Sequence, residues 1–197
     1  MKTRLIAICA ILVTALAGCS TSPPPQRFPE LTYGHLGVMR LDVEKVEIVN
    51  EYQAPLAPPN VDHLFPIPPE RAMRRWAQDR LAANGTPGRY ARFVITDAKV
   101  TETNLPRSTG LTGAFTKDQS QRYDLSMSAA IEIREDRGNF RTGYATASTS
   151  RSRSVREDIT INDREKVWFE MLEQAMNELN AELERQIKGN MARFLAM

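Results

Sequence analysis

The sequence predicts an α+β fold, a two-layer sandwich in which a four-stranded mixed sheet carries two helices on one face, in the order β-α-β-β-β-α. Residues 122–134 alternate between apolar and polar side chains, which is typical of a strand with one buried and one wet face. Two other stretches, 70–84 and the region after Asn162, have apolar residues at helical spacing. The first helix falls between two strands, which predicts a parallel pair with a right-handed crossover and leaves the later strands as a meander.

The first half of the domain is predicted as strand, loop, helix and strand. Residues 38–49 form the first strand, and a change in the parity of its apolar residues near Glu44 predicts a β-bulge. The loop 54–69 contains six prolines, so it should cross the surface in extended form. A helix over 70–84 then begins after Pro69 and stops at Gly85. Residues 90–100 are apolar on both faces, which predicts a central strand.

The second half is predicted as a hairpin followed by a long helix. The strand 122–134 turns at 136–139 into an antiparallel partner over 140–153. Asn162 is the expected N-cap of the last helix, with Glu165 at the capping-box position. The apolar stripe of that helix consists of Trp168, Leu172, Ala175, Leu179, Leu183 and Ile187.

The N-terminus has the features of an export signal. Lys2 and Arg4 precede an almost entirely apolar stretch, 5–16, that is too short to span a membrane comfortably. The stretch ends in Leu-Ala-Gly-Cys19, which looks like the lipobox of bacterial lipoproteins. That resemblance implies cleavage before Cys19 and covalent diacylglycerol and fatty acyl groups on its thiol, with no other cofactor. The alternative is an ordinary signal peptide with an accidental cysteine. Ser20 in the next position implies anchoring at the periplasmic face of the outer membrane rather than the inner membrane.

This assignment divides the chain and limits its chemistry. Residues 1–18 are the predicted signal peptide, 19–37 a lipidated proline-rich tether, and 38–190 a single periplasmic domain. Without Lys2 and Arg4 the remaining 24 basic residues balance the 24 acidic ones. A neutral chain gives no argument for nucleic acid as a partner. The signal takes Cys9 with it, so only an acylated cysteine is left and no disulfide can form.

The sequence contains no recognisable catalytic or metal-binding motif. After the predicted cleavage site the only histidines are His35 and His63, which lie far apart. Asp62 beside His63 could orient an imidazole as a base, but an exposed loop histidine is the favoured interpretation. We therefore expect no catalytic residue and no metal ligand, and a protein that is not an enzyme.

Three features could bind a partner or ligand. Leu111 and Phe115 lie in the glycine-containing loop 103–118, where they either contact a partner or lipid or tuck under the sheet. Arg151 and Arg153 project to one side of a strand and could hold an anion, although a solvated or aggregation-blocking strand end is the favoured interpretation. The apolar residues of the proline loop either pack over the sheet edge or dock a partner: Leu64, Phe65 and Ile67. Trp76 and Trp168 are expected in the core.

A lipobox, a tether and a small β-α-β-β-β-α domain resemble the envelope lipoproteins that serve transport machines. One such group is the lipopolysaccharide-assembly (LptE-like) lipoprotein, with its Tyr-x-Leu strand (here Tyr123-Asp124-Leu125), Arg-Ser hairpin partner and acidic last helix; the other is the auxiliary lipoprotein of ABC-type lipid transporters. The resemblance covers roughly 38–188. It implies a non-enzymatic accessory of lipid or lipopolysaccharide transport or outer-membrane assembly that binds an envelope protein partner. The alternatives are a lipid- or anion-binding module and a structural envelope lipoprotein with no transport role.

Overall fold

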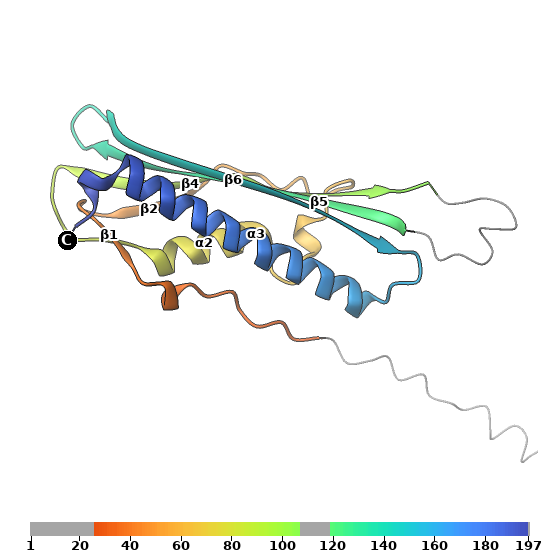
Figure 1. Ribbon diagram of the computed structural model, residues 1–197. Helices are drawn as coiled ribbons and strands as arrows, with labels where there is room; N and C mark the ends of the chain where they lie inside the picture. The colour runs from red at the N-terminus through yellow and green to blue at the C-terminus, as the bar shows by residue number, and fades with distance from the viewer. Residues whose placement is uncertain (1–25, 107–118, 197) are drawn as a thin grey trace, which may run out of the picture.

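The computed structural model describes residues 26–106 and 119–196. Its main sheet has four strands in the order β2-β4-β5-β6, namely β2 (Val46–Asn50), β4 (Arg89–Asn104), β5 (Gln119–Glu135) and β6 (Arg141–Arg156). The pair β2–β4 is parallel and the other two pairs are antiparallel. Two helices, α2 (Pro69–Arg80) and α3 (Ile161–Asn190), lie on the same side of this sheet (Figure 1). The predicted α+β fold with a four-stranded mixed sheet is confirmed.

The core lies between the sheet and the helices. Every apolar residue of the alternating pattern in β5, from Tyr123 to Ile133, is buried against this layer. The predicted stripe of α3 is buried as well, from Trp168 to Ile187. Trp76 of α2 packs against Phe93 of β4, with 5.4 Å between ring centroids. The two helical tryptophans are therefore core residues, as expected.

The first predicted strand is wrong in detail. Residues 38–49 form two strands, β1 (Met39–Leu41) and β2, which belong to different sheets. β1 pairs in parallel with β3 (Leu81–Ala83), so the change in apolar parity marks the passage between two sheets and not a bulge. A register shift does occur in the main sheet, in β4 between Ile95 and Asp97.

Two helix boundaries also differ from the sequence prediction. α2 ends at Arg80 and not at 84, because Leu81–Ala83 leave the helix to hydrogen-bond with β1. Gly85, with φ of +88°, follows that strand instead of ending the helix. The N-cap of α3 is Thr160, whose hydroxyl oxygen accepts the backbone N–H of Asp163 at 3.1 Å. Asn162 and Glu165 thus lie inside the first helical turns.

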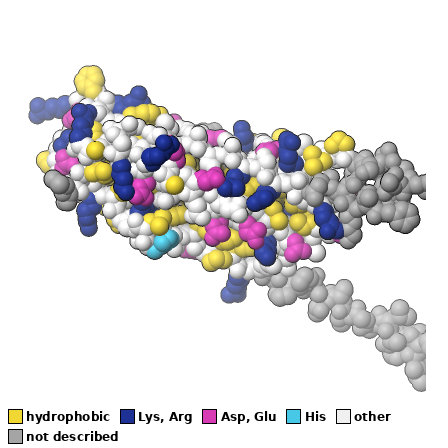
Figure 2. Space-filling view, in the orientation of Figure 1, with side chains coloured by type: hydrophobic (Ala, Val, Ile, Leu, Met, Phe, Trp, Pro, Cys, Tyr) yellow, Lys and Arg dark blue, Asp and Glu magenta, His cyan; other side chains and the backbone are white. Residues whose placement is uncertain are grey.

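The described residues also form three short 3₁₀ helices: η1 (Gly34–Leu36) before β1, η2 (Asp62–Leu64) before α2, and η3 (Ala192–Phe194) after α3. None of the helices among residues 26–106 and 119–196 has the length and apolarity needed to cross a bilayer. Positive and negative side chains are interspersed over the face seen in Figure 2. Many charged side chains of the described residues form short-range pairs, such as Arg74 with Glu70 at 2.6 Å. The visible face therefore carries no large field of a single sign.

Candidate functional site

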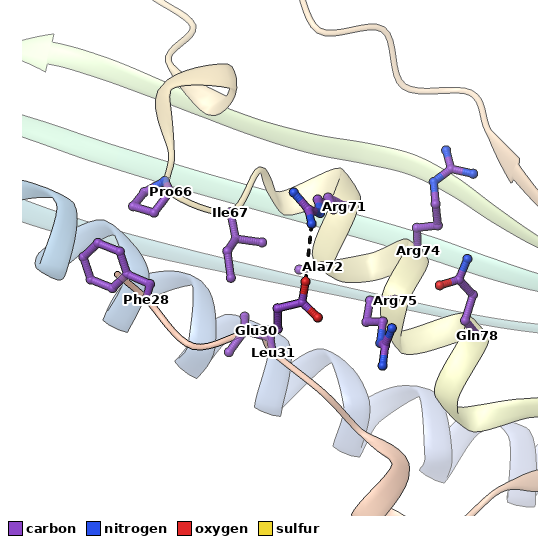
Figure 3. A pocket seen from close by; sticks show the side chains of 10 residues that line it. All are labelled: Phe28, Glu30, Leu31, Pro66, Ile67, Arg71, Ala72, Arg74, Arg75 and Gln78. Atoms are coloured by element: carbon purple, nitrogen blue, oxygen red, sulfur yellow. Dashed lines mark hydrogen bonds and ion pairs between the residues drawn. The ribbon is translucent and has the colours of Figure 1, made fainter. Parts of the chain in front are cut away.

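A groove of about 430 Å³ separates the N-terminal segment 26–37 from α2. One wall is the extended chain with Phe28, Glu30 and Leu31, and the other wall is helix α2 (Figure 3). The lining combines apolar and basic groups: Phe28, Leu31, Pro66, Ile67 and Ala72 with Arg71, Arg74, Arg75, Gln78 and Glu30. A groove that joins an apolar floor to several guanidinium groups suits an elongated apolar ligand or peptide that carries an acidic group.

The N-terminal segment is held on the domain by specific contacts. The Phe28 ring stacks on Phe169 of α3 with centroids 5.0 Å apart. Tyr33 is 4% exposed, and its backbone N–H donates to the Asp79 carboxylate at 2.9 Å. Arg80 donates to the carbonyl oxygens of Leu36 and Gly37. The second half of the predicted tether therefore forms part of the domain surface and builds one wall of the groove.

The arginines of α2 are paired, but not equally well. Arg74 contacts Glu70 at 2.6 Å, and Arg75 contacts Asp79 at 3.1 Å, both one turn apart on the helix. Arg71 reaches Glu30 across the groove at 3.5 Å, and both side chains are about two-thirds exposed, at 66% and 67%. In Figure 3 Arg71 points at Glu30, whereas Arg74 extends away from it. An exposed pair of this kind contributes little, so Arg71 is the arginine most readily taken over by an acidic ligand.

The predicted anion contacts on β6 face helix α3. Arg151 pairs with Glu178 and also donates to Gln174, at 3.1 Å. Arg153 donates to the same Gln174 side chain at 3.2 Å. The two arginines therefore lie side by side, as the strand pattern implies. Since Arg151 already has a carboxylate partner, an anion would have to displace Glu178 to bind both guanidinium groups.

The Asp62–His63 pair lies in η2 beside a small cavity of about 170 Å³. Asp62 is 4% exposed, whereas His63 is exposed on the surface. Burial, together with the nearby Asp62 carboxylate, raises the pKa of Tyr52 in the same cavity. The cavity is smaller than the roughly 300 Å³ at the lower end of ligand pockets. It does not provide the deep pocket that a base at His63 would need.

The apolar residues of the proline loop have three different environments. Leu64 is 55% exposed, whereas Phe65 is buried and stacks on Trp168 with ring centroids 4.9 Å apart. Ile67 is half-buried and lines the groove. Packing over the core thus accounts for Phe65, and Leu64 remains available for a partner. Among the described residues no group of three His, Cys, Asp or Glu side chains could hold a metal ion.

Three predicted site residues, Cys19, Leu111 and Phe115, lie outside the described residues. Conversely, sequence reasoning missed the groove, because its lining comes from three separate segments. One signal was present: Phe28 is a large aromatic residue in a stretch otherwise predicted to be a tether. An aromatic ring in such a segment favours a contact with the domain.

No protein-family model and no curated protein matches the sequence. Among solved structures, a minor lipoprotein from Acinetobacter baumannii aligns with 80% of this chain and 98% of its own, at 14% identity and a TM-score of 0.37. Rare lipoprotein B from Shewanella oneidensis aligns with 76% of this chain and 94% of its own, at 13% identity and a TM-score of 0.32. A Xanthomonas campestris protein of the family DUF330 covers 86% of this chain and 93% of its own, at 8% identity and a TM-score of 0.33.

Two of these three proteins are bacterial lipoproteins by name, and the chain is similar to them in structure only at low identity. A likeness at this level identifies neither a ligand nor a partner.

Proposed function

We propose that this chain is a lipid-anchored, non-enzymatic lipoprotein of the outer membrane. Its periplasm-facing domain would assist lipid or lipopolysaccharide transport, or outer-membrane assembly, by binding an envelope protein. The Leu-Ala-Gly-Cys19 sequence after a short apolar stretch supports the anchor. The groove between the segment 26–37 and α2 is the surface we assign to the partner.

The observation that carries this proposal is the short chain between the predicted anchor and the docked segment. Phe28, which is stacked on α3, comes only nine residues after Cys19 in the sequence. Fully extended, nine residues span at most about 32 Å. An acylated Cys19 would therefore hold the groove close to the membrane surface, within reach of a membrane-embedded partner.

The anchor is tested by metabolic labelling with an alkyne-bearing palmitate analogue. We expect label on the wild-type chain and none on Cys19→Ala, which should also move from the membrane fraction to the soluble periplasmic fraction. Equal labelling of both chains, or an unlabelled wild type, would reject the anchor. A Cys9→Ala control, inside the predicted signal, should label like the wild type.

The partner is tested by photo-crosslinking in cells. A photoreactive amino acid at Gln78 in the groove, and separately at Leu111 and Phe115, should crosslink to a membrane protein of defined mass. The same amino acid at Lys99, which is exposed on β4 away from the groove, is the matched control. Depletion of the protein should also make cells sensitive to large hydrophobic antibiotics. A normal permeability barrier together with no specific crosslink would refute the proposal.

A second candidate function, lipid or anion binding, is favoured by one observation, the combination of arginines with an apolar floor in the groove. Under this alternative, Arg71→Ala with Arg75→Ala weakens binding to phosphatidylglycerol or lipid A vesicles. Arg151→Ala with Arg153→Ala tests the anion contact on β6 in the same assay. Arg185→Ala, an exposed arginine on α3, is the control. If all three variants bind like the wild type, neither arginine pair holds a lipid.

A further inference from the structure

β6 is a long edge strand with one side unpaired. It pairs with β5 along one edge, and no strand of the described residues pairs with the other edge. Its 16 residues span roughly 53 Å at the rise of a β-strand. The opposite edge strand, β2, has only five residues. Soluble proteins usually protect long edges with prolines, lysines or bulges, because an open row of backbone groups accepts another strand.

The middle of β6 has none of these protections. Residues 146–150 read Thr-Ala-Ser-Thr-Ser, without proline or charge. Ser148, Ser150 and Ser152 are exposed, and their small side chains leave the backbone accessible. This edge therefore has the composition of a strand-pairing surface.

A groove of about 510 Å³ lies beside this edge, between β6 and α3. It is lined by residues 146–149 from the strand and by Glu178, Glu182 and Gln186 from the helix. Glu182 contacts Arg185, which is 72% exposed, and accepts the Gln186 amide at 2.8 Å, so no buried cation neutralises its carboxylate. Further along the strand, Arg153 contacts only the Gln174 amide and forms no ion pair within the described part of the chain. One half of the edge is thus acidic and the other half is basic.

We propose that a second copy of this chain pairs with β6 in antiparallel fashion, centred on Ser150. In this register Arg151 lies opposite Thr149 of the second copy, and Arg153 lies opposite Ala147. The odd-numbered residues of both strands then point towards α3, as Arg151 and Thr149 already do through their contacts with Glu178. Because Ala147 and Glu182 line the same groove, Arg153 comes beside Glu182 of the second copy.

The twofold axis makes this arrangement self-complementary. The acidic half of each edge meets the basic half of the other, and the contact between Arg153 and Glu182 occurs twice. The two sheets join into one eight-stranded sheet, and the open backbone groups in the middle of β6 are satisfied without any change of fold. The inference does not depend on the proposed function, since it rests on β6 and α3 alone.

Disulfide trapping of the full-length protein in cells tests the register. Residues at the centre of an antiparallel pair face their own copies with Cα atoms about 4.5–5.5 Å apart, within the range that a disulfide bridges. Ser150→Cys should therefore give a covalent dimer on brief oxidation. Thr146→Cys and Ser154→Cys, exposed on the same strand, are the controls, because each would lie far from its own copy. Wild-type protein measures any background from Cys19.

Charge reversal then tests the contact between the arginine and the glutamate. In the Ser150→Cys background, Arg153→Glu should lower the initial rate of dimer trapping roughly fivefold, because two symmetric ion pairs become repulsive. Adding Glu182→Arg should restore the rate, which a merely structural role of Arg153 would not do. No dimer from Ser150→Cys, equal dimer from Thr146→Cys, or trapping that the double reversal fails to restore would overturn the proposal. A disulfide of Ser150→Cys to a different protein, without homodimer, would assign the edge to another partner.

Discussion

Arg80 joins three segments of the chain that lie far apart in the sequence. Its side chain is 2% exposed and contacts the Glu184 carboxylate of α3 at 2.7 Å. It also donates to the backbone carbonyls of Leu36 and Gly37. One guanidinium group thus connects α2, α3 and the docked N-terminal segment. The buried charge is accommodated because Nη1 and Nη2 donate to fixed acceptors, whereas the buried Nε has no hydrogen-bond partner among the described residues.

Arg80→Ala should therefore destabilise the fold strongly. The substitution removes the donor of two carbonyl oxygens and one of the two cationic partners of Glu184, which keeps Lys188. We expect the free energy of unfolding to fall by about 3 kcal/mol. Urea unfolding followed by tryptophan fluorescence measures this change, since Trp76 and Trp168 are both buried. Arg185→Ala removes an exposed arginine of α3 and should leave stability close to that of the wild type. Equal losses for both variants would contradict the role of Arg80.

Glu132, near the turn of the β5–β6 hairpin, should make the stability of the fold depend on pH in the acidic range. It is a carboxylate on the open face of β5, 11% exposed, and it contacts Arg134 at 2.7 Å and Arg141 at 3.2 Å. Burial raises its pKa, but the hydrogen bonds and charges of the two arginines outweigh burial and hold the pKa below its usual range. A lowered pKa in the folded state means that the ionised group stabilises the fold above pH about 4.3, and that this stability is lost as pH falls through the folded-state pKa.

Glu132→Gln should accordingly be less stable than the wild type at pH 7. The difference in the free energy of unfolding should shrink as the pH is lowered from 5 towards 3, because the wild-type carboxylate then takes up a proton and loses its advantage. Urea unfolding of both chains at several pH values measures this. A difference that stays constant from pH 7 to pH 3 would mean that the charge of Glu132 does not stabilise the fold.

The start of α3 shows how neighbouring residues compete for one role. Thr160 and Asp163 have the spacing of an N-cap and its third helical residue, and so do Asn162 and Glu165 two positions later. The earlier pair forms the cap. Ile159, just before Thr160, packs against the core and fixes the point where the chain enters the helix. Asn162 and Glu165 therefore lie inside the helix and do not form its N-cap.

This assignment predicts opposite outcomes for two similar substitutions. Thr160→Ala removes the acceptor for the Asp163 N–H and should lower the free energy of unfolding by about 1 kcal/mol. Asn162→Ala lies inside the helix, where alanine is the better helix former, so it should be neutral or stabilising by a few tenths of a kcal/mol. Thermal unfolding monitored by circular dichroism compares the two variants. A larger loss for Asn162→Ala would move the cap back to the position that the sequence alone favoured.

The elements that the sequence predicted well are those with long periodic patterns. β5 and α3 each bury every apolar residue of their predicted faces, because one pattern extends over many turns or pleats. The sequence prediction was wrong for the short elements, for a different reason. Leu81–Ala83 continue the helical pattern of α2 in sequence, but they pair with β1, and long-range pairing overrides a local preference of only three residues. No local signal announces such a pairing.

At the scale of the whole molecule, the sequence did not predict the candidate groove, because the groove also depends on contacts between distant segments. Its walls join Phe28 and Leu31 to Ile67 and to α2, residues that share no motif or spacing. Proline content predicted an extended segment, and its described part, 26–37, contains no helix or strand other than the short η1. Composition does not predict that Phe28 stacks on an aromatic residue of α3. Docking of that segment creates both the groove and the short reach to Cys19.

Docking of the segment 26–37 should therefore depend on a few contacts that can be removed separately. Phe28→Ala deletes the ring stacked on Phe169, while Tyr33 and Arg80 still hold the later part of the segment. We expect trypsin to cut after Arg27 several-fold faster in this variant, because backbone that is freed from the domain is easier to cleave. Phe169→Ala should have the same effect, and the double variant should add little, since both substitutions remove one contact. Mass spectrometry follows the rate of cleavage after Arg27, and global stability is measured in parallel. Docking would be contradicted if the single variants were cleaved at the wild-type rate, or if the effects of the two substitutions added in the double variant.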